Sequence, residues 1–142
     1  MSIKAAIAHA VPVSVALKPF NVRDEIHNLL KEWVACVNGR DLQCLRQLYA
    51  DGACIQPTLA RSALKTEEAI HLYFSDLLSK RDLSVQVDEL DFVHEKSLVI
   101  AGEYTFSYWE CGTIKVLPAR FSFTCVWVGD ELRFIHQQSS PW

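Results

Sequence analysis

The sequence predicts an α+β domain in which helices cover one face of a curved antiparallel sheet. Its first half has apolar residues at helical spacings of three and four, whereas from Leu83 onward the spacing changes to two. Helices that come first and strands that come second are typical of α+β folds. With 142 residues, 50% hydrophobic and only 22% charged, the chain has the length and composition of one well-cored domain.

The helices follow from caps and periodic apolar positions. Ile26, Leu29, Leu30 and Trp33 belong to one apolar stripe that predicts an amphipathic first helix. The second helix is shorter, and the third carries two glutamates in its first turn, where the helix dipole favours negative charge. The predicted helices run from Asn21 or Asp24 to Gly39, from Asp41 to Asp51-Gly52, and from Thr66 to about Ser79.

A short strand and a four-strand meander complete the predicted fold. The strands run over Ala53–Gln56, Ser84–Val93, Leu98–Trp109, Ile114–Trp127 and Glu131–Ser139. The alternation slips near Asp88-Glu89 and near Leu117-Pro118, which predicts two β-bulges. Because the strands are unusually apolar on both faces, we expect a second subunit to cover the outer face and form a homodimer.

Composition argues against several partners and cofactors. The net charge is −3 and the basic residues are scattered, so we expect no nucleic acid as a partner. No run of eighteen apolar residues occurs, so nothing is expected to span a membrane. The chain has no glycine-rich phosphate cradle and no His-Glu-x-x-His or His-x-His spacing, so neither a cofactor nor a metal ion is expected.

The N-terminus and the cysteines give two more expectations. Residues 1–20 are apolar and rich in Ala and Val, and we interpret them as an N-terminal arm that precedes one domain over residues 21–142. The five cysteines have no Cys-x-x-Cys spacing and lie mostly within apolar patterns. They are therefore expected to be inert free thiols of a reduced, cytoplasmic protein.

The last strand carries the first functional candidate. By simple alternation one face holds Leu132, Phe134, His136, Gln138 and Ser140. Apolar side chains give way to polar ones along this face, which predicts a cavity wall with an imidazole at its polar end. His136 is therefore the candidate acid or base, against the alternative of a structural histidine that bonds a neighbouring group.

The same region carries a family resemblance. Ala119–Phe123 and Gly129–Pro141 resemble the ending of nuclear transport factor 2-like (SnoaL-like) proteins, in particular the branch of the calcium/calmodulin-dependent protein kinase II association domain. Leu48–Ala53 and Thr66–Ile70 are similar to that family's helix-to-strand junction and to the opening of its third helix. The resemblance spans residues 22–141.

The resemblance implies a cone-shaped, cystatin-like fold with an internal pocket, usually dimeric through the sheet. The family's last strand often carries an aromatic, an aliphatic, two histidines and a serine at alternate positions. Here Leu132 and Gln138 depart from that pattern, and Gln138 replaces a group that could titrate near neutral pH.

Six residues are predicted to line the pocket. Glu103 and Tyr104 fall on opposite faces of one strand, and Tyr104 is favoured inside because an aromatic ring with a polar tip suits a cavity. The predicted pocket residues are Trp33, Tyr49, Tyr104, Arg120, His136 and Gln138.

Three functions stay open at this level. The first is a domain that binds a small apolar or carboxylate-bearing molecule through Arg120 and His136. The second is a cofactor-free isomerase, cyclase or hydratase that uses His136 with Tyr104 or Glu103. The third is an oligomeric assembly module. The missing second histidine and the absence of an Asp-based motif favour binding.

Overall fold

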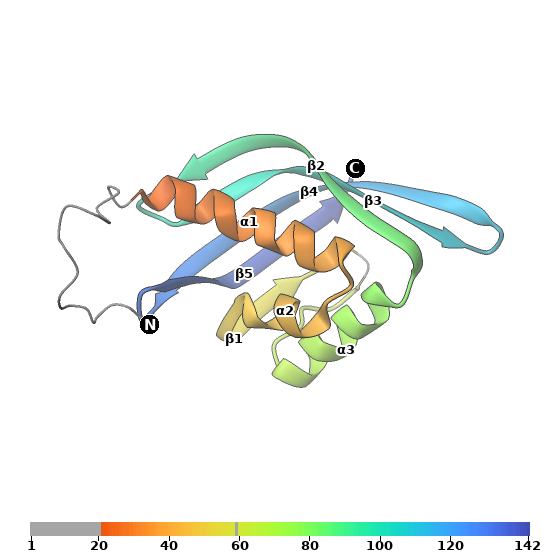
Figure 1. Cartoon of the computed structure of the whole chain (residues 1–142), viewed down its shortest axis with the longest axis horizontal. Coiled ribbons are helices and arrows are strands. Elements are labelled where there is room, and N and C mark those ends of the chain that lie inside the picture. Colours follow the sequence, from red (N-terminus) through yellow and green to blue (C-terminus); the bar gives the residue numbers. More distant parts are fainter. Residues whose placement is uncertain (1–20, 59) are drawn as a thin grey trace, which may run out of the picture.

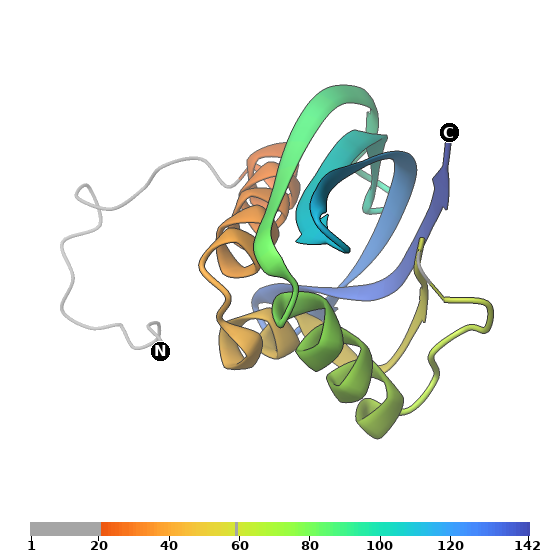
Figure 2. The ribbon, with the colours of Figure 1, turned by 90° about the vertical axis from the view of Figure 1, so that its right-hand side faces the viewer.

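Three helices lie against the concave face of a strongly curved sheet (Figures 1 and 2). The computed structural model describes residues 21–58 and 60–142, so the predicted arm at residues 1–20 lies outside the described residues. The helices are α1 (Val22–Asn38), α2 (Leu42–Gln47) and α3 (Glu67–Leu78). The predicted α+β fold with a curved antiparallel sheet and three N-terminal helices is confirmed.

The sheet has five strands in the order β1-β5-β4-β3-β2, in which β1 pairs parallel with β5 and the other pairs are antiparallel. The last strand of the sequence therefore lies between β1 and β4, and one of its faces points into the interior. The strands are β1 (Tyr49–Gln56), β2 (Arg81–His94), β3 (Val99–Glu110), β4 (Thr113–Val128) and β5 (Glu131–Pro141).

The predicted helix starts are correct, but the second helix is shorter than predicted. Side chains of Asn21, Asp41 and Thr66 accept hydrogen bonds from backbone N–H groups three residues on, at 3.0–3.2 Å. α2 ends at Gln47. The backbone carbonyl of Leu48 instead accepts a hydrogen bond from the N–H of Phe134 at 2.7 Å, so pairing with β5 competes with helical bonding and β1 begins at Tyr49.

One predicted bulge is confirmed and the other is wrong. The register of β2 on β3 shifts between Val87 and Glu89, as the alternation indicated. At Leu117-Pro118 the register with β3 is unbroken. Pro118 lies just past the final β4–β5 pair, Ala119 with Pro141, where β4 no longer needs an N–H donor toward β5, so the proline is tolerated without a bulge.

The cysteine prediction is wrong for two residues. Cys36 and Cys44 form a disulfide, with their Cα atoms 6.0 Å apart. The turn at Gly39 and Arg40 reverses the chain and brings the last turns of α1 beside the first turn of α2. That proximity comes from the packing of the two helices, and a search for Cys-x-x-Cys spacing could not detect it. Cys54, Cys111 and Cys125 are free.

The end of α1 is tied to the beginning of β2. The Asn38 side chain accepts from the N–H of Val85 at 2.8 Å and donates to its carbonyl at 3.0 Å. The Arg40 guanidinium donates to the carbonyl oxygens of Leu78, Lys80 and Leu83 at 2.8–3.4 Å. These bonds hold α1 alongside β2 and satisfy carbonyls at the end of α3.

A helix that spans a membrane needs about 20 consecutive, mostly apolar residues. Across residues 21–58 and 60–142, none of the helices combines the length and apolar character required to span a membrane.

At Gly102 the backbones of β2 and β3 lie too close together for a side chain between them. A Cβ at this position would lie 2.1 Å from the carbonyl oxygen of Glu89, a backbone atom beside the β2 bulge. We expect Gly102→Ala to lower the free energy of unfolding by about 1–3 kcal/mol, measured by urea denaturation. The matched control is Ala101→Ser on the opposite face. Equal stabilities of the two variants would contradict this account of the bulge.

Candidate functional site

A row of polar side chains crosses the otherwise aromatic interior. Trp33 Nε1 donates to the hydroxyl of Tyr49 at 3.0 Å, and that hydroxyl donates to Gln137 Oε1. The hydroxyls of Thr58 and Ser139 bond one another, and the Tyr104 hydroxyl interacts with Gln137, Ser139 and Thr58. We call this set the interior polar row: Trp33, Tyr49, Thr58, Tyr104, Gln137 and Ser139.

Aromatic rings fill the space around the interior polar row. Trp33 stacks on Tyr104 with ring centroids 5.5 Å apart, and Tyr104 stacks on Phe121 at 4.6 Å. Phe123 stacks on Phe134 at 4.3 Å. Trp33 and Tyr104 are each 1% exposed. The row is therefore a buried hydrogen-bonded network, of the kind that makes one packing arrangement of a core unique.

The interior polar row is electrically neutral. Burial raises the pKa of Tyr49 well above 10.0 and also raises the pKa of Tyr104. Burial likewise raises the pKa of the Cys125 thiol to about 12. The buried polar residues in the described part of the chain are Gln137 and Ser139, neither of which ionises. The row can donate and accept hydrogen bonds, but it holds no group poised to exchange a proton near neutral pH.

The structure brings together three of the six predicted pocket residues. Trp33, Tyr49 and Tyr104 meet in the interior polar row. Glu103 is in register with Arg120 and lies on the opposite face of β3 from the buried Tyr104. The prediction that the other three share this interior is wrong. Arg120 is exposed and its guanidinium lies 4.1 Å from the ring centroid of Trp142.

His136 and Gln138 lie on the outer side of β5. The Nε2 of His136 is 3.0 Å from the side-chain oxygen of Gln56 on β1. Gln138 is half-buried opposite Ser122. The contact with Gln56 fits the alternative prediction for His136, a structural histidine that bonds a neighbouring side chain.

A β-bulge in β5 explains why His136 and Gln138 lie on the outer side, although simple alternation placed them inside. Thr124 pairs with His136, but its neighbour Cys125 pairs with Phe134, so Ile135 is an extra residue in β5. Leu132 and Phe134 point inward before the bulge, and Gln137 and Ser139 point inward after it. Sequence reasoning missed these two residues because polar side chains occupy both phases of the strand after Ile135, which leaves no apolar period to reveal the slip.

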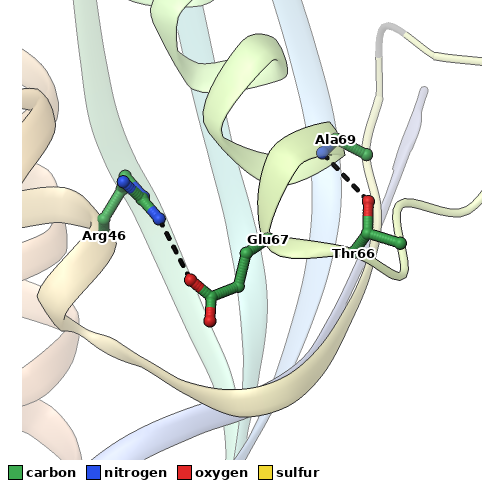
Figure 3. A network of polar contacts seen from close by, with 4 residues as sticks. All are labelled: Arg46, Thr66, Glu67 and Ala69. Carbon is green, nitrogen blue, oxygen red and sulfur yellow. Dashed lines mark hydrogen bonds and ion pairs between the residues drawn. The ribbon is translucent and has the colours of Figure 1, made fainter.

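A basic cleft lies beside the interior polar row and shares Tyr49 with it. The cleft has a volume of about 580 Å³ and lies between α2, α3 and β5. Arg46 on α2 contacts Glu67 on α3 at 3.3 Å (Figure 3), and Arg133 bonds Glu131. The cleft is lined by Leu42, Gln43, Arg46, Gln47, Tyr49, His71 and Arg133.

The imidazole of His71 is one of the side chains that line the basic cleft. Its Nδ1 is buried and has no hydrogen-bond partner among the described residues. Buried polar atoms without partners are rare because they lose solvation without gaining a bond. Each arginine also keeps guanidinium donors beyond the single carboxylate contact described above. The cleft can therefore offer several N–H donors to an anionic group. Within the described residues, no three His, Cys, Asp or Glu side chains come together as a metal site would require.

The family model of the calcium/calmodulin dependent protein kinase II association domain matches residues 22–142. The chain belongs to this family. The predicted resemblance to this association domain is thus confirmed, and the match covers all described elements of the fold. A comparison with the curated proteins gives no significant match.

Solved structures agree on the fold. A Xanthomonas campestris protein described as an association domain of this kind is 23% identical, with a TM-score of 0.74 over 83% of this chain and 86% of that chain. A nuclear transport factor 2-like protein from Pseudomonas putida is 16% identical, with a TM-score of 0.69 over 83% and 84%. The epoxide hydrolase/cyclase-like enzyme SalBIII is 13% identical, with a TM-score of 0.73 over 84% and 92%.

Loss of the Tyr49 hydroxyl, which lies at the centre of the interior polar row, should destabilise this protein. We expect Tyr49→Phe to lower the free energy of unfolding by about 1–3 kcal/mol at pH 7, because Trp33 Nε1 and Gln137 lose a buried partner. Urea denaturation measures this loss. Tyr108→Phe is the control, since its ring packs under Lys80 and takes no part in the row. A loss no larger than in this control would contradict the role of the row.

The wild type and Tyr49→Phe should also differ in how their stability depends on pH above pH 10. Folding raises the pKa of Tyr49 above 10.0, so above pH 10 the unfolded chain binds fewer protons than the folded chain, and stability falls as the pH rises. Tyr49→Phe lacks this group, and the stability gap between wild type and variant should narrow above pH 10.

Proposed function

We propose that this protein is a small-molecule-binding domain that holds a carboxylate-bearing molecule in the basic cleft. The observation that carries the proposal is that the guanidinium groups of Arg46 and Arg133 line the same cleft as the His71 imidazole. A carboxylate accepts charge-assisted hydrogen bonds from guanidinium groups, and these bonds are stronger than neutral ones. The apolar Leu42 and the ring of Tyr49 would contact the remainder of such a molecule.

Binding is favoured over turnover by the chemistry of the interior. A cofactor-free isomerase, cyclase or hydratase would need a group that accepts or donates a proton next to the substrate. His136, the candidate acid or base, bonds Gln56 on the outer side of β5. The raised pKa values of Tyr49 and Tyr104 keep both hydroxyls protonated at neutral pH. The SalBIII likeness supports the shared fold and assigns no reaction to this chain.

A charged-group substitution tests the basic cleft. We expect phenylacetate to raise the melting temperature of the wild type and the uncharged phenylacetamide to leave it unchanged. Arg133→Gln should weaken phenylacetate binding about tenfold or more, because a lost hydrogen bond to a charged group costs about 1.5–3 kcal/mol. Isothermal titration calorimetry measures the affinity.

Arg120→Gln is the matched control, because it removes the same charge from the outer face, where Arg120 packs on Trp142. Its phenylacetate affinity should equal that of the wild type. Equal losses in both variants would indicate non-specific charge attraction, and the absence of any phenylacetate shift in the wild type would contradict this ligand class.

Assembly through the outer face of the sheet is a second proposed property. Ile114 and Val116 on β4 are 62% and 65% exposed, which is unusual for large apolar side chains on a strand. The family to which the chain belongs is described as an association domain. Both observations support a homodimer in which the outer faces of two sheets meet.

The proposed dimer can be measured directly. We expect the wild type to sediment as a dimer at micromolar concentration and Val116→Asp to sediment as a monomer, because a buried unpaired carboxylate is costly. Leu72→Asp is the control, since Leu72 is 61% exposed on α3, away from the sheet. A monomeric wild type would refute the proposed dimer.

A further inference from the structure

Helix α2 forms more than half of the wall of the basic cleft. Four of the seven residues that line the cleft belong to this helix, and one of them is Arg46. The other three, Tyr49, His71 and Arg133, come from β1, α3 and β5. The position of α2 therefore determines the shape of the cleft and the place of one of its two guanidinium groups. The α2 residues in the wall are Leu42, Gln43, Arg46 and Gln47.

Side-chain contacts hold the middle of α2 weakly. The helix has six residues, and a helix of that length is not stable without support from the rest of the fold. Of its residues Leu45 alone is buried. The contact between Arg46 and Glu67 (Figure 3) joins side chains that are 38% and 72% exposed, and exposed ion pairs of this kind contribute little.

A disulfide holds α2 between two points where the backbone is fixed. Before the helix, the N–H of Asp41 donates to the carbonyl of Cys36 at 3.0 Å. After the helix, the carbonyl of Leu48 accepts from the N–H of Phe134 at 2.7 Å. Cys44, the third residue of α2, is bonded to Cys36 on α1. This bond excludes conformations in which α2 rotates away from α1, so it restrains Arg46 as well.

The two sulfurs of this disulfide differ in their access to a reductant. Cys44 is half-buried, whereas Cys36 is 3% exposed. A thiolate of a small dithiol therefore attacks the Sγ of Cys44, and the Sγ of Cys36 leaves with the electron pair and takes up a proton. The second thiol of the reductant then displaces Cys44 as a thiol. The dithiol gives up two electrons and becomes a disulfide, and the protein gains two thiols.

The reduced pair fits the same fold. A buried thiol behaves as a small apolar group, and Cys36 belongs to the hydrophobic core. The three free cysteines, Cys54, Cys111 and Cys125, lie on β1, in the turn before β4 and on β4. Helices α1 and α2 thus carry no other cysteine that would compete for either sulfur. The Cys36–Cys44 bond can therefore open and close again without a change of partner.

We propose that the Cys36–Cys44 disulfide is a redox-sensitive tie that controls the basic cleft through the position of α2. This inference rests on the proposed function of the cleft. In the oxidised protein the tie keeps Arg46 in the cleft wall, and in the reduced protein α2 leaves its place for part of the time. The affinity for a carboxylate falls in proportion to the fraction of molecules in which α2 is in place. A threefold weaker affinity corresponds to a fraction of about one third.

Phenylacetate titrations of the two redox states test the tie. Peptide mapping should find Cys36 linked to Cys44 in air-oxidised protein, and both as thiols after treatment with dithiothreitol. Isothermal titration calorimetry of the reduced protein, freed of dithiothreitol under anaerobic conditions, should give an affinity at least about threefold weaker than that of the oxidised protein. Saturating phenylacetate should favour the disulfide over the dithiol form by the same factor, because binding and reduction are linked.

Amide hydrogen exchange measures the freedom of α2 without any ligand. The N–H of Leu45 bonds the carbonyl of Asp41 at 3.0 Å. It should exchange at least about threefold faster after reduction, because α2 opens more often. The N–H of Val85, which Asn38 holds at 2.8 Å, should exchange equally in both states.

Two serine variants separate the tie from other effects of the reductant. Cys44→Ser cannot form the disulfide, so it should bind phenylacetate as weakly as the reduced wild type and should not respond to dithiothreitol. Cys54→Ser is the matched control, because it replaces another half-buried cysteine, on β1. It should keep the wild-type difference between the two redox states.

The outcomes distinguish the tie from the ligand. Free thiols at Cys36 and Cys44 after air oxidation, or equal Leu45 exchange in the two states, would overturn the proposal. Faster Leu45 exchange with equal phenylacetate affinities would also overturn it, because α2 would then not control the cleft. Phenylacetate that binds neither state, together with faster Leu45 exchange after reduction, would refute the proposed ligand and support the tie.

Discussion

The placement of Trp33 against the concave sheet is the interaction on which the interior depends. Its ring stacks on Tyr104 of β3 and meets the edge of Phe123 of β4, and its N–H bonds Tyr49 at the start of β1. One side chain of α1 thereby joins three strands. Because the curved sheet surrounds this residue, the same packing determines which strand positions lie inside and how much space remains there.

The interior polar row follows from that packing. Burying a polar atom is tolerated only when it finds a partner, and the hydroxyl of Tyr49 satisfies both Trp33 and Gln137. Burial then keeps the tyrosines protonated, so the interior is a neutral network. The charged groups lie outside it, where Arg46, His71 and Arg133 line the basic cleft next to Tyr49. Ligand chemistry is therefore expected at the boundary of the core.

The β-bulge at Ile135 is the reason that His136 and Gln138, which were predicted to line the pocket, lie on the outer side of β5. On β3 and β4 the unbroken alternation grouped Phe121 with Phe123 and set Arg120 on the opposite face, but the prediction of Arg120 in the pocket chose the wrong face of β4, because Tyr104, Phe121 and Phe123 lie inside. After Phe134 the strand is polar in both phases, and one extra residue exchanges His136 and Gln138 for Gln137 and Ser139. No local propensity distinguishes these two registers, because pairing with Thr124 and Cys125 of β4 selects between them. The disulfide between Cys36 and Cys44 likewise depends on how α1 and α2 pack.

By itself the sequence determined the order of helices and strands, the caps at Asp41 and Thr66, a choice between Asn21 and Asp24 for the first cap, the apolar stripes and the family. Those features depend on neighbouring residues and on periods of 3.6 and 2, which a linear chain displays directly. Only the tertiary structure decided the face of His136, the grouping of Arg46, His71 and Arg133, and the order of the strands in the sheet. Each of these depends on contacts between segments distant in the chain, whose registers are selected by the packing of the whole interior.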